Sequence, residues 1–291
     1  MECKRNKHNL KIALVYTKND YDNNNFFADQ IIYELTKWNV LCDLILIDNN
    51  NKIDLTKYEV IINRSRSIDF LINKKKDSIV LNNPTFTDMA NNKFKTYLWC
   101  KLNKINVLDT KLFNKKNNLT YPFVIKEIKG HGGKEVYKIN DINDLNKINL
   151  INKEFIIQDF FKQGNVDIRV YVMFKKILFV AKRMATNLNE FRSNFSINKN
   201  ASKFRLNFLQ KKYVKKIINK LPLGFYGLDF FINDKKKLIL NEIEDVVGSR
   251  MIYHLKPKIN VPKIFVASIL KNLKKCKSWN DKRFWNDIIK F

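Results

Sequence analysis

The chain has 291 residues, of which 45% are hydrophobic and 29% are charged, and its 55 Lys+Arg against 28 Asp+Glu give a formal net charge of +27. It is too apolar for a disordered protein and long enough to fold into two or three subdomains. No 18-residue apolar stretch and no signal-peptide pattern is found, which predicts a cytoplasmic protein without a membrane span.

The first 85 residues alternate between predicted strands and helices. Apolar runs predict strands at 11–16, 41–47, 58–63 and 78–81, and helical spacing predicts a helix at 24–38. This alternation is typical of a small open parallel-sheet α/β domain. A further helix is expected at 87–102, after Asn82-Asn83-Pro84 ends that domain.

From residue 121 the pattern changes to strands joined by short turns. Strands are expected at 121–128, 134–139, 155–161, 168–174 and 176–183. They are followed by a helix at 203–221, a hairpin of 224–232 with 237–244, and a last helix at 262–275. No internal repeat or low-complexity linker interrupts these elements.

Cysteine and histidine are sparse and scattered. The cysteines are Cys3, Cys42, Cys100 and Cys276, and the histidines are His8, His131 and His254. Their spacing excludes a zinc ribbon and gives no disulfide framework. Any metal is therefore expected to have oxygen ligands.

The high positive charge leaves two interpretations open. Clustered Lys and Arg bind nucleic-acid phosphates and release counterions. Nearly all of the surplus here is Lys, spread from end to end beside abundant Asn and Ile. This dispersal favours a compositional bias over a polyanion-binding surface, although composition alone does not decide between them.

The scarce residue types indicate where the chemistry lies. All seven glycines fall between residues 120 and 255, and Arg169, Arg183, Arg192 and Arg250 share that window. A rare glycine is retained where a Cβ atom would not fit, and the planar guanidinium suits phosphate or carboxylate. The functional site is therefore predicted in this window.

A predicted strand ends in Lys126 and is followed by a glycine-rich turn at 130–133. Such a β-turn-β flap can present backbone N–H groups to phosphates while the lysine neutralises them. The turn is neither a Walker loop nor a dinucleotide-binding fingerprint. An ordinary tight turn explains the same residues, so this motif alone is weak.

Three carboxylates form a sharper signal. Glu242 and Glu244 point to one face of their strand, and the hairpin brings Asp229 opposite them on the partner strand. Clustered carboxylates repel unless cations lie between them, and oxygen-only clusters suit Mg²⁺. The apolar context of these strands argues against a solvent-facing acidic strand, so a metal site is predicted.

In the order in which they occur, these motifs resemble the ATP-grasp ligases, and most of all the RimK-like carboxylate-amine ligases. The resemblance rests on the following segments: 122–126 with 130–133, 157–159, 167–169, 182–183, 191–194, 227–229 and 241–244. It covers essentially the whole chain. It implies an ATP-grasp fold with an N-terminal parallel-sheet α/β domain at 1–88, a central α+β lobe carrying the flap at 89–157, and a C-terminal α+β lobe carrying the metal site at 158–291.

The resemblance also implies roles for individual residues. Those expected to contact ATP are Lys93, Lys126, Gly130, Gly132, Gly133, Gln158, Asp159, Phe160, Asp167, Arg192 and Asn194. Asp229, Glu242 and Glu244 match the Mg²⁺ (or Mn²⁺) ligands. Arg169, Arg183, Arg192 and Arg250 are the candidate catalytic residues. Arg192 matches a loop near the transferred phosphate, and the other three would bind the substrate carboxylate and stabilise an acyl phosphate.

Two departures from the family pattern concern the metal site and the substrate. The family commonly has Asn where this chain has Glu244, which adds a negative charge. After it the family usually has a Pro-Gly turn, whereas this chain continues to Gly248-Ser249-Arg250, which is expected to place a guanidinium near the substrate.

The leading hypothesis is an ATP-dependent ligase that phosphorylates a substrate carboxylate and lets an amine displace the phosphate. Its acceptor is left open: a peptide, protein or small molecule extended by an amino acid such as glutamate, or a precursor peptide that is crosslinked. The alternatives are a catalytically silent ATP-binding module and an RNA-binding protein. The dispersed charge disfavours nucleic acid as a partner, no membrane partner is expected, and a homo-oligomer is left open.

Overall fold

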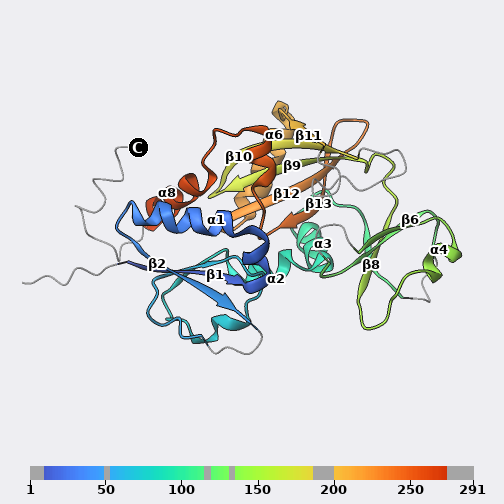
Figure 1. The fold of residues 1–291 in the computed structure, drawn as a ribbon. Coiled ribbons are helices and arrows are strands. Elements are labelled where there is room, and N and C mark those ends of the chain that lie inside the picture. The colour runs from blue at the N-terminus through green and yellow to red at the C-terminus, as the bar shows by residue number, and fades with distance from the viewer. Residues whose placement is uncertain (1–9, 49–52, 115–118, 131–134, 186–199, 274–291) are drawn as a thin grey trace, which may run out of the picture. The chain divides into compact units, whose positions relative to one another are not determined.

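The computed structural model describes residues 10–48, 53–114, 119–130, 135–185 and 200–273. The chain divides into two compact units, 1–84 with 258–291 and 85–257 (Figure 1). In these described ranges, no helix combines the length and the apolar character needed to cross a bilayer.

The first unit contains a four-stranded parallel sheet, as the alternating pattern predicts. Its strands are β1 (Lys11–Thr17), β2 (Leu41–Ile47), β3 (Val60–Asn63) and β4 (Ile79–Leu81), in the order β2-β1-β3-β4. A short 3-10 helix, η1 (Asp69–Asn73), lies between β3 and β4. One face of the sheet packs on an apolar cluster that includes Val15, Ile61 and Leu71.

Helix α1 (Lys18–Thr36) begins six residues earlier than predicted. The Thr17 side chain caps it by accepting a hydrogen bond from the Asp20 N–H, which satisfies one of the free donors of the first turn. The helix is interrupted at Asn24, where φ is −158° and ψ is 51°. This interruption explains why the apolar spacing predicted a start at 24, since the regular period begins only there.

Helix α8 (Val261–Leu273) packs against α1 within the first unit (Figure 1). The rings of Phe27 and Phe265 lie 6.3 Å apart, and Asn260 donates a hydrogen bond to the buried Glu34 carboxylate at 2.9 Å. The segment 158–291, expected as one lobe, therefore includes a helix that the structure groups with residues 1–84.

The second unit begins with two helices where a single helix at 87–102 was predicted. They are α2 (Pro84–Ala90), which starts at the boundary, and α3 (Lys93–Leu102). The prediction of one helix is wrong because Asn92 has extended backbone angles and its side chain caps α3 by accepting from the Lys95 N–H. A capping residue competes with the helical conformation at its own position.

A four-stranded antiparallel sheet follows. It consists of β5 (Thr110–Leu112), β6 (Phe123–Glu127), β7 (Val136–Ile139) and β8 (Phe155–Asp159), in the order β5-β8-β6-β7, with a short helix α4 (Ile142–Asn146). One face is covered by an apolar cluster that includes Phe123, Ile125 and Phe155. Because strand side chains alternate, Val124, Lys126, Ile156 and Gln158 lie on the opposite face.

The second sheet of this unit has five strands. They are β9 (Val166–Met173), β10 (Lys176–Met184), β11 (Ala201–Lys203), β12 (Phe225–Ile232) and β13 (Leu238–Glu244), in the order β11-β10-β9-β12-β13. Two helices accompany them, α6 (Phe208–Lys220) and α7 (Arg250–Leu255). The predicted helix at 203–221 starts later, because Asn207 and Gln210 form a reciprocal capping box.

The five-stranded sheet separates an apolar face from a charged one. The apolar face packs on α6 through residues such as Val170 and Leu228 of the sheet and Val214 and Ile217 of the helix. The charged face carries the side chains that alternate with them. This face, rather than the one under α6, borders the candidate site.

Candidate functional site

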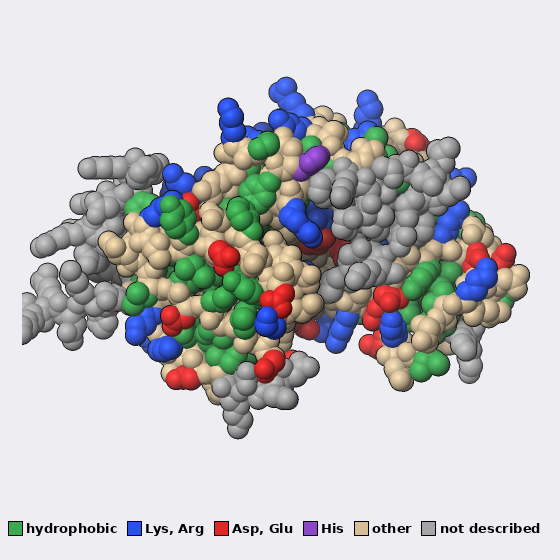
Figure 2. Space-filling view, viewed as in Figure 1, with side chains coloured by type: hydrophobic (Ala, Val, Ile, Leu, Met, Phe, Trp, Pro, Cys, Tyr) green, Lys and Arg blue, Asp and Glu red, His purple; other side chains and the backbone are tan. Residues whose placement is uncertain are grey.

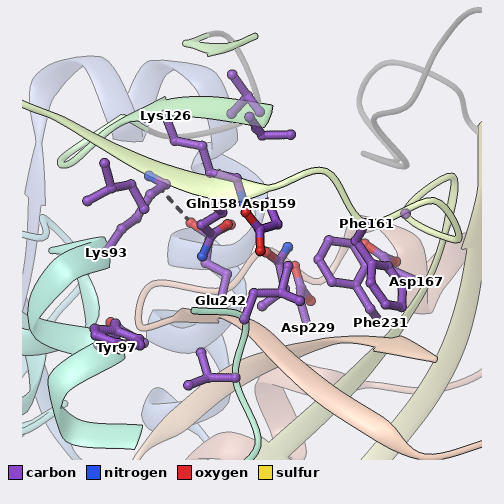
Figure 3. Close-up of a pocket in the computed structure, with 18 of the residues that line it drawn as sticks. Lys93, Tyr97, Lys126, Gln158, Asp159, Phe161, Asp167, Asp229, Phe231 and Glu242 are labelled. Atoms are coloured by element: carbon purple, nitrogen blue, oxygen red, sulfur yellow. Dashed lines mark hydrogen bonds and ion pairs between the residues drawn. The ribbon is translucent and has the colours of Figure 1, made fainter. Parts of the chain in front are cut away.

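A pocket lies between the two sheets of the second unit (Figure 3). Its walls come from β6 and β8 of one sheet, from β12 and β13 of the other, and from α3 and the segment before β5. That segment is held along β13, where the Leu240 N–H donates to the Asn106 carbonyl at 2.8 Å. Both sheets therefore contribute their non-core faces to the pocket.

Two lysines from different elements meet at one end of the pocket (Figure 3). Lys126, on β6, is buried and donates a hydrogen bond to the Asn241 side-chain oxygen at 2.9 Å. Lys93, the first residue of α3, donates to the Gly130 carbonyl and lies 3.9 Å from the Glu242 carboxylate. Lys93 thus fixes the start of the glycine-rich turn beside Lys126.

The pKa of Lys126 is lowered to about 8, mainly because the ammonium group is buried. The nearby Glu242 carboxylate raises this pKa, and the positive charge of Lys93 lowers it. A lysine whose charge is poorly solvated gains from an anion placed next to it. This end of the pocket therefore has the electrostatics of a phosphate site.

Asn241 reaches the pocket because of a β-bulge in β13. Asp229 pairs with Glu242 and Phe230 pairs with Leu240, so Asn241 is an extra residue on its strand. The bulge shifts the alternation, and both Asn241 and Glu242 leave the core and line the pocket. Asp229 was predicted to lie roughly opposite Glu242 and Glu244; it pairs with Glu242, while Glu244 pairs with Gly227. The bulge was not predicted.

Gln158 brings a buried hydrogen-bond acceptor to the pocket wall. Its side-chain nitrogen donates to the Thr110 hydroxyl at 2.8 Å. Its side-chain oxygen is buried and has no hydrogen-bond partner among the residues that the structure describes. A buried acceptor without a partner is costly, so a ligand that presents an N–H group to Gln158 would be favoured.

Aromatic side chains form the other end of the pocket. The rings of Phe161 and Phe231 are stacked at 5.0 Å, and both line the pocket together with Gly164. A Cβ atom on Gly164 would lie 2.9 Å from the Phe161 carbonyl oxygen, so the turn requires glycine there. Apolar walls with few polar groups are typical of a site that binds a flat ring.

A chain of ion pairs crosses the charged face of the five-stranded sheet. Arg169 on β9 lies opposite Asp229 on β12. It donates to the two Asp229 oxygens at 2.7 and 2.5 Å and to Glu244 at 2.5 Å. Arg183 on β10 forms a two-point contact with Asp167 and donates to Asp229 at 2.7 Å. Asp229 thus accepts three charge-assisted hydrogen bonds while only 2% exposed.

This network keeps Asp229 and its two arginines ionised. Burial raises the pKa of Asp229, but the charges of Arg169 and Arg183 and their hydrogen bonds outweigh it and hold this pKa at about 2. Burial opposes the charge on Arg169 too, but Asp229 and Glu244 raise its pKa above the ordinary value. The arginines therefore neutralise Asp229 and Glu244, two of the three carboxylates that the sequence assigned to a cation.

Two of the three predicted metal ligands are arranged as a divalent cation requires. Asp229 and Glu242 are paired across the sheet, and both line the pocket. Three of the four lone pairs on the Asp229 carboxylate accept hydrogen bonds from the arginines, which leaves one lone pair on Oδ1. Glu244 instead holds Arg169. Within the described residues, no three His, Cys, Asp or Glu side chains are grouped to hold a metal ion. Two carboxylates thus fit an Mg²⁺-type ion, while the third faces a guanidinium.

The structure brings most of the predicted site residues together. Those that line the pocket are Lys93, Lys126, Gly130, Gln158, Asp159, Phe160, Asp167, Arg183, Asp229 and Glu242. Arg169 and Glu244 are not among the lining residues but contact Asp229 or each other. Arg250 is exposed at the start of α7 and does not line the pocket. Gly132, Gly133, Arg192 and Asn194 lie outside the described residues.

Sequence reasoning missed the apolar part of the pocket. The missed residues include Val124, Val136, Ile156, Phe161 and Phe231. A signal was present for two of them, because Val124 and Ile156 lie two positions from Lys126 and Gln158 on the same strands and must share their faces.

Known proteins are similar to this chain in sequence. A family model described as the RimK-like ATP-grasp domain matches residues 89–269. The Mycoplasma genitalium protein MG011 is 36% identical over 273 residues, covering 92% of this chain and 95% of that protein. The alpha-aminoadipate–LysW ligase LysX of Saccharolobus solfataricus is 24% identical over 224 residues, covering 70% of this chain and 80% of LysX.

Solved structures share the fold. A RimK domain ATP-grasp protein from Sphaerobacter thermophilus superimposes with a TM-score of 0.66 at 12% identity, covering 88% of this chain and 98% of that one. The D-alanine–D-alanine ligase of Bacillus anthracis, solved with ATP, gives 0.66 at 13% identity, covering 92% and 99%. The resemblance and fold class inferred from the sequence are confirmed.

Proposed function

The chain belongs to the RimK-like ATP-grasp family of carboxylate-amine ligases, and from this premise we propose that it joins a carboxylate to an amine through an acyl phosphate made at the expense of ATP. The observation that carries the proposal is the pocket itself. It places two lysines, a buried free acceptor and an aromatic wall in one cavity. These groups suit the phosphates and the base of a nucleotide.

Each end of the pocket has its own part in this proposal. Lys93 and Lys126 neutralise the nucleotide phosphates beside Gly130. The Gln158 oxygen accepts a hydrogen bond from the amino group of adenine, beside Asp159 and Phe160. Asp229 and Glu242 hold Mg²⁺, which supplies charge neutralisation at the phosphates when bound.

The reaction then needs no nucleophilic side chain. A carboxylate oxygen of the substrate attacks the γ-phosphorus, the bond to the β–γ bridging oxygen breaks, and ADP departs. The amine attacks the acyl carbon, the C–N bond forms, phosphate leaves with its oxygen, and the ammonium loses a proton. Arg183, which reaches the pocket, is placed to stabilise the negative charge of the acyl phosphate. The amine acceptor is an amino acid, a peptide or a protein in this proposal.

The decisive test is product formation. The protein is incubated with ATP, Mg²⁺ and a panel of amino acids and peptides, and ADP release is measured together with mass spectrometry for a condensation product. We expect ADP and product to appear in equal amounts for at least one acceptor. No ADP above background from a well-folded sample with any acceptor would argue against an active ligase.

The depressed pKa of Lys126 predicts that nucleotide binding takes up a proton. Above a pKa of about 8 the free lysine is largely neutral, whereas a bound phosphate favours its charged form. Uptake should approach about one proton per nucleotide near pH 9 and vanish from this group near pH 7. ATP affinity should therefore weaken as the pH rises through 8. Calorimetry in buffers of different ionisation enthalpy measures the uptake, and buffer-independent heats at pH 9 would refute it.

Glu244 is expected to act by positioning Arg169. Glu244→Ala removes the carboxylate that holds the guanidinium and should lower the rate of ADP formation by about tenfold or more. Glu244→Gln keeps a hydrogen-bond acceptor and should retain most of the rate, with an unchanged Mg²⁺ requirement. An Mg²⁺ titration of both variants checks this, and a Gln variant that needs much more Mg²⁺ would make Glu244 a metal ligand instead.

A further inference from the structure

Among the described helices and strands of the second unit, α6 carries the most lysines. Five of its thirteen residues are lysines, at 211, 212, 215, 216 and 220, and all five are exposed. The opposite side of the helix, with Val214, Ile217 and Ile218, is buried against the sheet. The lysines therefore share the outer face and point away from the core.

No acidic residue stands beside these lysines along the chain, and Asp234 is the one exposed carboxylate on the neighbouring turn between β12 and β13. The sequence contains no Asp or Glu between residues 191 and 228. By contrast, α1 mixes Lys18 with Asp20, Asp22 and Asp29 and forms an ion pair within the helix. A proteome-wide preference for lysine explains the number of lysines but not this local exclusion of carboxylates.

The charged face continues beyond the helix. Lys203 and Arg205 are exposed just before α6, and Lys235, Lys236 and Lys237 are exposed on the turn between β12 and β13. Gln210 ties this turn to the helix by donating to the Lys236 carbonyl at 2.9 Å. Figure 2 shows lysine and arginine side chains projecting at the top of the view, over β11 and α6. We call this surface, α6 with residues 203, 205 and 235–237, the basic face.

An apolar tip adjoins the lysines. Phe208 and Leu209, the first residues of α6, are 81% and 72% exposed. Lys212, Lys216 and Lys220 then follow at four-residue spacing, roughly 6 Å apart along the helix axis. A row of cations beside an exposed ring suits a chain with regularly spaced phosphates and free bases, because the phosphates pair with lysines and a base stacks on the ring.

We propose that the basic face binds single-stranded nucleic acid. A duplex would satisfy the lysines but leave the Phe208 ring without an unstacked base, and an acidic polypeptide offers no flat base for it. The basic face lies on the α6 side of the sheet, whereas the nucleotide pocket lies on the other side, so the two sites are separate. The proposal is independent of the ligase activity.

The test uses the full-length protein and a labelled 20-nucleotide oligouridine RNA, with oligothymidine DNA as a second arm. Binding is followed by fluorescence anisotropy over a range of salt concentrations. The lysines at 211, 212, 215 and 216 are changed together to Gln. The matched control changes four other exposed lysines, at 75, 76, 104 and 111, to Gln and has the same net charge.

We expect the basic-face variant to lose about tenfold or more in affinity at low salt and its salt slope to fall by about 0.7 for each lost phosphate contact. The control should stay close to the wild type. Phe208→Ser should weaken binding by about fivefold or more without changing the salt slope. Comparison of the affinities for oligouridine RNA and oligothymidine DNA shows which of the two nucleic acids is preferred.

Three outcomes would overturn the proposal. Equal losses in the basic-face and control variants would show that only net charge matters. A polyglutamate probe of equal charge that binds as tightly as RNA would assign the face to an acidic polypeptide. Absence of binding at low salt would remove the site altogether. ATP turnover of the basic-face variant should match the wild type, which separates this test from that of the ligase.

Discussion

Replacing Lys126 with methionine should lower kcat/KM for ATP by about 100-fold or more while leaving the protein folded. Methionine fills nearly the same volume but cannot neutralise phosphate. Lys126 is buried, its pKa is lowered to about 8 by that burial, and its ammonium group faces Asn241 inside the pocket. The loss should appear in the dissociation constant for ATP, because the proposed contact with the phosphates is the same in the ground and transition states.

The thermal stability of Lys126→Met should stay the same or rise, whereas its affinity for ATP should fall. A buried lysine with a lowered pKa destabilises the folded state below pH 10, because the unfolded chain holds that proton more tightly. Lys126→Met removes this cost, so the midpoint of thermal unfolding should be equal to or higher than that of the wild type. The matched control is Lys129→Met, which changes an exposed lysine three residues further along the chain. It should alter neither the affinity for ATP nor the midpoint of thermal unfolding. A wild-type affinity for ATP in Lys126→Met would remove this residue from the phosphate site.

The part of the site that could be predicted from the sequence is the part fixed by local pairing. Asp229 and Glu242 stand on two strands joined by a short turn, so an antiparallel hairpin must bring them opposite each other, as the register confirms. The extra residue Asn241 was not predicted, because a bulge changes the alternation without changing the residue types around it. Its contact with Lys126 is consequently absent from the sequence pattern.

Contacts between distant strands lay beyond sequence reasoning. Arg169 meets Asp229 only because β9 and β12 are neighbours in the sheet, although β10, β11 and α6 separate them along the chain. The sequence identified both residues as part of the site but assigned them to different ligands. The same limit applies to α8. The spacing of its apolar residues predicts its apolar face, but the tertiary fold determines that this face packs against α1.

The second large effect is expected at Asp229, where Asp229→Asn should destabilise the protein by about 3 kcal/mol or more and abolish turnover. The change leaves Arg169 with only Glu244 and Arg183 with only Asp167. It also turns amide hydrogens toward two buried guanidinium groups that now lack a shared anion. Urea unfolding at pH 7 measures the loss, and Asp234→Asn, at an exposed position on the same hairpin, is the control and should stay within about 0.5 kcal/mol of the wild type.

The pH dependence identifies the charge as the cause. The pKa of Asp229 is held at about 2 in the folded protein, below the value of about 4 in an unfolded chain. Its stabilising contribution is therefore complete above pH 4 and is lost as the pH falls toward 2. The stability difference between the wild type and Asp229→Asn should shrink over that range. Adding Arg169→Met to Asp229→Asn should cost less than the sum of the single changes, because both changes remove the same ion pair. A constant difference down to pH 2 together with full additivity would mean that Asp229 acts through packing alone.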